Sequence, residues 1–484
     1  MFSLYLTGFA KLDELSVGFR TLRLSAPQKM PQKAPAPNVA TLRDFNSNQP
    51  ISKIPIELLC EIFTKFVNDP TISRIENPTG PLVSRHSSVD PTILGQVCSR
   101  WRDTALNLPT LWSTICIRNP AKSQLYRTHL WLERSADQPL NLTLEDGIEG
   151  RDLNATWNIV RAFYSHADKW RRIDFSVPPD LLASIGHLGQ DAPPCKQLES
   201  IQFRTTNPVS DRLRQLQARS PNWENPYLDS VWSFFHSSPS LQEVCYTVKR
   251  SDLLPRNTPF VQLTSVSIDF TLSPDVLLGA LSQFPNLYSI RANIDSTEFH
   301  PPQSVARTAC PIITLKHLRT AELFSGRPLT QFFQHLTLPS LETLLLTIAT
   351  FFDGKSISHH SALQSLLQRS NCCLKKLQFI DRQMNEDDAC IYLETPELQA
   401  LSFLEFGANL STKFISLLSQ TNLNGSHQNL PALQELHLGN TTNTPDGMLS
   451  QMIAGRLPVL KRFNIMTKSG GYGPIDEAFF ESNY

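Results

Sequence analysis

The chain has 484 residues, which is room for about two to four average domains or for one long repeat array. Hydrophobic residues make up 40% of the chain, which excludes a wholly disordered protein. The 44 basic residues balance 44 acidic ones, so the sequence carries no general signature of binding to nucleic acid or to an anionic membrane. No apolar run reaches the roughly 18 residues of a membrane-spanning helix. We therefore expect neither nucleic acid nor a membrane as a partner.

The sequence also lacks the motifs of metal, cofactor and catalytic sites. Its nine cysteines are irregularly spaced without a C-x-x-C pair, which argues against a disulfide framework and against a zinc site. Gly354-Lys355-Ser356 has Ala349 where a phosphate-binding loop requires glycine. We expect free thiols in a reducing compartment, cytoplasmic or nuclear, with no metal, no cofactor and no catalytic residue.

Residues 1–48 have the composition of a flexible tail that ends in a linker. Asp13 and Glu14 follow the first apolar residues, which disfavours a mitochondrial transit peptide because such peptides are poor in acids. Several prolines between residues 27 and 37 are typical of a linker. We expect no folded domain in this segment.

Residues 49–118 have the pattern of a small helical module. Apolar residues at helical spacing predict a first helix that starts at Ile54-Pro55 and runs to Phe66. A proline-rich loop over 70–91 separates it from a second predicted helix over 92–106, and a short strand should follow over 114–117. These helices carry more apolar residues than two helices can bury against each other, which predicts a partner.

Three ordered blocks of this module resemble the F-box, in the F-box-like form that is abundant in mushroom-forming fungi. The blocks are Ile54-Pro55-x-Glu57-Leu58-Leu59-x-x-Ile62-Phe63, Val97-Cys98-Ser99-Arg100-Trp101-Arg102 and Leu108-Pro109-x-Leu111-Trp112-Ser113. The resemblance implies docking onto a Skp-type adaptor, which links F-box proteins to a cullin–RING ubiquitin ligase. By position, it assigns docking to Ile54, Pro55, Leu58, Leu59, Ile62, Phe63, Val97, Cys98 and Trp101. For each of these residues the alternative is packing in the core of the module itself.

A degenerate repeat fills the rest of the chain, residues 119–484. The hexamer leucine-x-x-apolar-x-apolar begins at Leu198, Leu241, Leu263, Leu318, Leu341, Leu374, Leu398, Leu433 and Leu460, with weaker copies from Trp170 and Leu287. Helical patterns lie between many of the hexamers, for example over 276–284 and 363–367. Strand followed by helix at this period is similar to the leucine-rich repeat, although no asparagine ladder follows the strands. We expect an α/β protein with an irregular solenoid, parallel strands on its concave face and helices outside; the alternative is a non-repeat α/β domain.

Residues that alternate with the apolar positions of each strand should face away from the helices. This assigns target binding to Arg172, Asp174, Glu243, Arg291, Glu322, Lys376, Gln378, Glu435, His437, Arg462 and Asn464. Their mixed charges suit a protein surface better than a phosphate backbone. The alternative is that they only keep the sheet soluble.

Together these features predict a non-enzymatic subunit that recognises the substrates of an SCF-type (cullin–RING) ubiquitin ligase. The F-box-like module would dock the adaptor, and the repeats would hold a protein target close to the ubiquitin carrier. The alternative is a leucine-rich-repeat scaffold or interaction module that takes no part in a ligase. An enzyme is a third hypothesis, and no residue constellation in the sequence favours it.

Overall fold

The computed structural model describes residues 53–68, 90–147, 152–205, 226–247, 260–294, 312–327, 329–349, 360–381, 384–457, 459–467 and 471–483. The predicted tail over 1–48 and nearly all of the predicted loop over 70–91 lie outside these residues. The chain divides into two units, residues 1–59 and 60–484, and all the strands of the described residues belong to the second.

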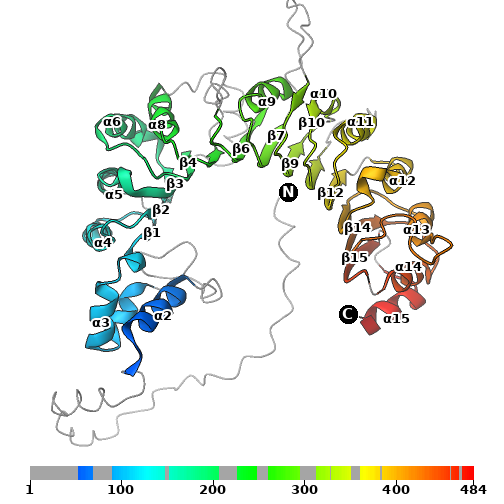
Figure 1. Cartoon of the computed structure of the whole chain (residues 1–484), viewed down its shortest axis with the longest axis horizontal. Coiled ribbons are helices and arrows are strands. Elements are labelled where there is room, and N and C mark those ends of the chain that lie inside the picture. The colour runs from blue at the N-terminus through cyan, green and yellow to red at the C-terminus, as the bar shows by residue number, and fades with distance from the viewer. Residues whose placement is uncertain are drawn as a thin grey trace, which may run out of the picture. The chain divides into compact units, whose positions relative to one another are not determined.

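Thirteen parallel strands form one sheet in the second unit (Figure 1). They are β1 (Thr114–Arg118), β2 (Leu140–Glu145), β3 (Trp170–Val177), β4 (Ser200–Thr205), β5 (Glu243–Tyr246), β6 (Ser265–Leu272), β7 (Ser289–Ile294), β9 (Thr320–Ser325), β11 (Thr343–Ile348), β12 (Lys376–Asp381), β13 (Phe403–Phe406), β14 (Glu435–Thr441) and β15 (Arg462–Thr467). Two further short strands, β8 (Ile313–Thr314) and β10 (Leu336–Thr337), pair with each other. The predicted α/β class with parallel strands is confirmed.

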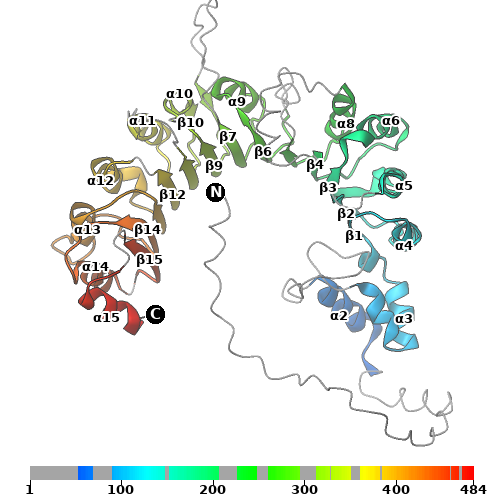
Figure 2. The same cartoon turned by 180° about the vertical axis from the view of Figure 1, so that it is seen from behind.

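Helices alternate with the strands along the chain. They are α4 (Lys122–Arg134), α5 (Leu153–Tyr164), α6 (Leu182–Asp191), α8 (Pro226–His236), α9 (Pro274–Leu281), α10 (Thr330–Gln334), α11 (His360–Ser370), α12 (Glu386–Glu394), α13 (Thr412–Ser419), α14 (Met448–Arg456) and α15 (Pro474–Asn483). The strand order of the sheet never reverses along the described chain, so right-handed crossovers place the connecting helices on one face. Figures 1 and 2 show this one-sided arrangement from the two directions, and it is that of a leucine-rich-repeat-type solenoid.

The core of this unit lies between the sheet and its helices. The leucines that open the hexamers are buried, and the two apolar positions that follow form continuous buried rows from β3 to β14. In β15 the first of these positions, Phe463, is partly exposed. Aromatic side chains fill the space between the layers. Trp232 of α8 packs edge-on against Phe203 of β4, and Tyr392 of α12 packs edge-on against Phe379 of β12.

The sheet begins earlier than the sequence pattern indicated. β1 and β2 pair in register with each other and then with β3, so the repeat region starts near residue 114 rather than at 119 or 170. The hexamer was hidden here because Trp112 and Pro139 stand where leucine stands in the later copies. Trp112 nevertheless takes the core position of that leucine, with 1% of its surface exposed.

The hexamer assigned to Leu398 is out of register with the structure. Leu398 ends a short 3₁₀ turn, η8 (Pro396–Leu398), and the strand that follows buries Leu404 and Phe406. The correct hexamer therefore begins three residues later, at Leu401. As a result, Phe403 faces away from the helices instead of lying in the core.

The helical segments before the sheet differ from expectation in one place. The first helix, α2 (Ile56–Asn68), forms as predicted. The second predicted helix over 92–106 is instead a 3₁₀ helix, η3 (Pro91–Gln96), followed by α3 (Ser99–Leu106). The break falls at Cys98, where the backbone is extended and Sγ accepts a hydrogen bond from the Trp101 N–H at 3.5 Å. Gly95 just before it has low helix propensity, which favours an interruption at this point.

Candidate interaction surface

The sheet face opposite the helices carries the side chains that alternate with the buried ones, and we call it the open face. One row across it, aligned by strand register, consists of Arg172, Ser200, Glu243, Ser265, Ser289, Thr320, Thr343, Lys376, Phe403, Glu435 and Arg462. The next row consists of Asp174, Gln202, Cys245, Ser267, Arg291, Glu322, Leu345, Gln378, Glu405, His437 and Asn464. All eleven residues assigned to target binding lie in these two rows, so their common face is as predicted. Target binding itself stays a prediction.

Charged side chains of the open face are largely paired with one another. Arg204 donates a hydrogen bond to Asp174 at 2.8 Å, and Asp174 is buried beneath it. Arg291 lies 3.6 Å from Glu322 on the next strand. Such partly exposed pairs contribute about 1 kcal/mol or less each, so their main effect is to cancel charge across the surface.

The same pairing continues beside the rows and at the last strands. Glu342 lies 3.5 Å from Arg319 and 3.2 Å from Lys375, on either side of it in the sheet. Glu435 accepts a hydrogen bond from His437 at 2.9 Å when that ring nitrogen is protonated, and Arg462 lies 3.9 Å away. The open face therefore has charged groups but little net charge.

Four large apolar side chains lie on the open face on adjacent strands, two within the rows and two beside them. Phe324 of β9, Leu345 of β11, Ile380 of β12 and Phe403 of β13 are partly exposed at positions that alternate with buried ones. Aromatic and aliphatic side chains on a polar surface are frequent anchors of protein partners. The open face over β9 to β13 is thus better suited to a protein partner than the open face over the earlier, more polar strands.

Phe403 contacts side chains of both neighbouring strands, Lys376 of β12 and His437 of β14. Lys376 Nζ lies 4.2 Å from the centre of the phenyl ring, and the His437 ring lies 5.3 Å away at an interplanar angle of 30°. A cation over a phenyl face and a tilted ring contact each fix the orientation of the ring. Phe403 therefore presents a preformed surface.

Glu405 differs from the other acids nearby because it makes no hydrogen bond and no ion pair with the described residues. It is half-buried on β13, and burial raises the pKa of its carboxyl group, opposed by the more distant charges of His437 and Lys376. The sequence pattern did not indicate Glu405 because the hexamer at Leu398 was out of register. The signal that could have found it is the alternative hexamer at Leu401.

The residues assigned to adaptor docking fall into three exposure groups. Pro55, Leu58, Ile62 and Val97 are exposed, Ile54, Cys98 and Trp101 are partly exposed, and Leu59 and Phe63 are fully buried. Phe63 packs edge-on against Trp101 at 4.9 Å. Leu59 and Phe63 are therefore core positions rather than docking positions, because a side chain with no exposed surface offers nothing to a partner.

Exposure of the remaining apolar residues is high. Leu58 is 51% exposed and Ile62, one helical turn further along α2, is 47% exposed. In the second helical segment, Val97 is 58% and Ile93 is 49% exposed, and the resemblance had not assigned Ile93 to docking. Exposed apolar residues in this number favour contact with a partner.

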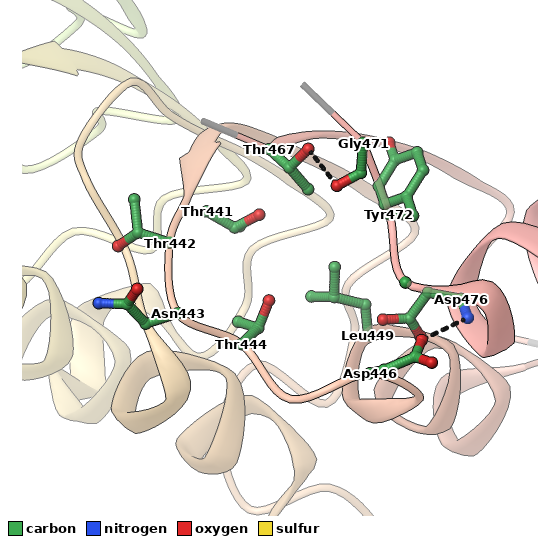
Figure 3. A pocket seen from close by; sticks show the side chains of 11 residues that line it. Thr441, Thr442, Asn443, Thr444, Asp446, Leu449, Thr467, Gly471, Tyr472 and Asp476 are labelled. Carbon is green, nitrogen blue, oxygen red and sulfur yellow. Dashed lines mark hydrogen bonds between the residues drawn. The ribbon is translucent and has the colours of Figure 1, made fainter. Parts of the chain in front are cut away.

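A polar pocket of about 410 Å³ lies at the C-terminal end of the sheet (Figure 3). Its lining residues are Thr441, Thr442, Asn443, Thr444, Asp446, Leu449, Thr467, Gly471, Tyr472, Gly473 and Asp476. Thr467 Oγ1 donates to the Gly471 carbonyl at 3.1 Å. Gly473 is required by packing, since a Cβ there would lie 2.3 Å from Cγ of Asp446.

The two carboxylates of this pocket accept hydrogen bonds from backbone N–H groups at the N-termini of helices. Asp446 accepts hydrogen bonds from the N–H groups of Ile475 and Asp476 at 3.0 and 3.1 Å, which caps α15. Asp476 accepts one from the Ser450 N–H at 2.8 Å, in the first turn of α14. Carboxylates at helix N-termini stabilise exposed N–H groups and the helix dipole, so their role here is structural.

The cysteines of the described residues do not indicate a catalytic site either. Burial raises the pKa of Cys195 to about 12 and those of Cys245 and Cys372 to about 11, which makes these thiols poor nucleophiles. Within the described ranges, no cluster of three His, Cys, Asp or Glu side chains could hold a metal ion. None of the helices described here is long and apolar enough to cross a membrane.

Comparison with protein-family models finds no match for the chain, and comparison with curated proteins finds none either. What the structure shows is therefore the architecture: an all-parallel sheet of 13 strands that alternate with helices, of the leucine-rich-repeat solenoid type.

Proposed function

We propose that the chain is the substrate-recognition subunit of an SCF-type (cullin–RING) ubiquitin ligase. Its F-box-like helices would dock a Skp-type adaptor, and the open face would hold a protein target. The observation that carries the proposal is the exposure of apolar side chains on those helices. Ile56, Leu58, Ile62, Ile93, Val97 and Leu106 are six of the 18 exposed large apolar side chains among the described residues, although their segments form a small part of them.

Two further observations support a receptor rather than an enzyme. The strand order does not reverse along the described sheet, so the sheet lacks the crevice at a reversal point where open α/β sheets bind small ligands. The raised pKa values of Cys195, Cys245 and Cys372 make these three thiols unsuited to accept ubiquitin in a relay. In this proposal the chain promotes ubiquitin transfer by proximity alone.

A repeat scaffold outside any ligase is the second candidate. The aromatic side chains of the open face favour it to the same extent, because they suit a protein partner whether or not an adaptor is bound. Binding of the adaptor separates the two candidates.

A matched pair of valines tests the adaptor contact. Val97→Asp should abolish co-purification with a co-expressed fungal Skp-type adaptor, because the interface would bury an unpaired carboxylate. Val459→Asp is the control, since Val459 is 43% exposed in the loop before β15 and lies outside the F-box-like helices. Equal adaptor binding by both variants, each shown to be folded by circular dichroism, would refute the assignment of Val97 to this interface.

A further inference from the structure

Glu405 and its surroundings on β13 indicate what kind of target segment the open face takes. We infer that the open face binds a polypeptide segment with an arginine or lysine that pairs with Glu405 and with apolar neighbours that pack on Phe403, Ile380 and Leu345. The inference rests on the proposed role of the repeats in holding a protein target.

The Glu405 carboxylate has no hydrogen-bonding or ionic partner among the described residues. Other acids of this region have cations within 4 Å, as Glu322, Glu342 and Glu435 show. Glu405 is half-buried without such a cation and without a hydrogen bond from the described residues. A carboxylate that has lost part of its water without a replacement contact costs free energy, which an incoming cation would recover.

The two basic side chains that influence the pKa of Glu405 contact other groups. Lys376 Nζ lies over the ring of Phe403, and His437 Nε2 lies 2.9 Å from Oε1 of Glu435. Both groups lower the pKa of Glu405, but burial raises it more, so they compensate the carboxylate only in part. A cation of a partner would complete the compensation.

Glycines border Glu405 along the open face. The positions that follow Glu405 and His437 on the open face are Gly407 and Gly439, which carry no side chains. The strands approach closely here, since a Cβ on Gly407 would lie 3.0 Å from Cγ2 of Ile380. Glu405 is thus bordered by bare backbone on one side and by Phe403 on the other.

An apolar surface lies beside Glu405. Leu345, Ile380 and Phe403 lie on three neighbouring strands that end with the strand of Glu405. Strand spacing of about 4.8 Å places Leu345 roughly 10 Å from Glu405, which an extended chain spans in about three residues. One short segment can therefore reach both. A nucleic acid is disfavoured, because the unpaired carboxylate would repel phosphate.

The test is selection from a random dodecapeptide library displayed on phage, with the purified full chain as bait. We expect the wild-type chain to enrich peptides with arginine or lysine close to a large apolar residue. For synthetic copies of those peptides, Glu405→Gln should weaken binding about tenfold or more, because it removes one partner of a partly buried charge pair. Replacing the basic residue of the peptide by glutamine should weaken binding to the wild type but not further to the variant.

Glu394→Gln is the matched control, because Glu394 is an exposed acid at the end of helix α12 and does not lie on the open face. It should select and bind the same peptides as the wild type. The inference is overturned if no peptide is enriched, if the enriched peptides lack basic residues, or if Glu405→Gln binds them with unchanged affinity. None of these outcomes depends on the adaptor, so failure here is distinguishable from failure of the Val97 test.

Discussion

Trp112 shows how one residue joins the helical segments to the sheet. Its indole N–H donates to the Ala105 carbonyl at 2.9 Å, and its ring meets Trp131 edge-on at 5.4 Å. The Arg134 guanidinium lies 4.7 Å from the ring centre. The residue thus connects the end of α3 to the first repeat helix.

We expect Trp112→Ala to lower the free energy of unfolding by about 3–5 kcal/mol, because it removes a large buried ring and leaves a cavity. Urea unfolding followed by circular dichroism measures this. Tyr126→Ala is the control, since Tyr126 is 75% exposed on α4 and should change stability little. Equal unfolding midpoints for the two variants would contradict the structural role of Trp112.

Arg456 donates hydrogen bonds to backbone carbonyls between repeats. At this one position it does what an asparagine ladder does in regular repeats. Only 2% of it is exposed, and its guanidinium donates to the carbonyls of Leu418, Asn429 and Leu430 at 2.6 to 3.1 Å. Burial lowers its pKa to about 10, so it remains charged at neutral pH. It therefore satisfies carbonyls between successive repeats from a single side chain.

Replacing Arg456 by lysine should cost about 1–3 kcal/mol, because one ammonium group cannot reach all three carbonyls that the planar guanidinium serves. Differential scanning fluorimetry should show a lower midpoint. Arg462→Lys, on an exposed arginine of β15, should leave the midpoint unchanged. An Arg456→Lys protein as stable as the wild type would show that water replaces these bonds.

At the scale of elements, a partly buried histidine, His236, and a buried one, His360, connect helices to their neighbours. His236 ends α8 and lies 3.0 Å from the hydroxyl of Tyr246 on β5. His360 begins α11 and lies 3.0 Å from the hydroxyl of Tyr392 on α12. Burial lowers the pKa of His236 to about 4 and also lowers that of His360, although Asp388 and Asp381 oppose the second shift.

These pKa values predict a loss of stability in acid. Below about pH 6.5 the unfolded chain binds protons at these histidines while the folded chain keeps them neutral, so the free energy of unfolding falls as pH drops from about 6.5 towards 4. Urea titrations at pH 7 and pH 5 measure the difference. His236→Gln should reduce this pH dependence, and a variant with an undiminished dependence would show that other groups cause it.

The strands show what a sequence pattern can and cannot resolve. The leucine hexamer located most strands because each apolar position on one sheet face must be buried. It failed at β13, where Leu398 in a 3₁₀ turn mimics the pattern three residues before the true start at Leu401. It also failed at β1 and β2, where Trp112 and Pro139 replace the leucine. Register within a leucine-rich segment depends on tertiary packing, which the pattern alone does not contain.

For the candidate sites, the sequence predicted on which face of the sheet a residue lies better than it predicted which side chains are in contact. Period-two alternation was sufficient to place all eleven assigned residues on the open face. The pairing of Arg204 with Asp174, or the absence of a partner for Glu405, depends on side-chain positions across strands far apart in sequence. Likewise, the F-box resemblance pointed to apolar helix positions, but the structure was needed to separate buried Leu59 from exposed Leu58.

At the scale of the whole molecule, the proposal requires two binding surfaces that work at once. The helical segments would hold the adaptor while the open face holds a target, because ubiquitin transfer by proximity needs both in one assembly. The apolar exposure near Val97 and the unpaired Glu405 belong to separate elements, α3 with its preceding 3₁₀ turn and β13. Changes at one surface should therefore leave the other unaffected.

Sedimentation velocity with a fluorescently labelled fungal Skp-type adaptor tests the central claim most directly. The account predicts that the adaptor sediments with the full chain in a 1:1 complex, and that a differently labelled peptide from the phage selection joins the same boundary. Val97→Asp should release the adaptor and keep the peptide. Glu405→Gln should release the peptide and keep the adaptor. An adaptor that sediments at its own rate, with the wild-type chain present in excess at micromolar concentration, would contradict the account.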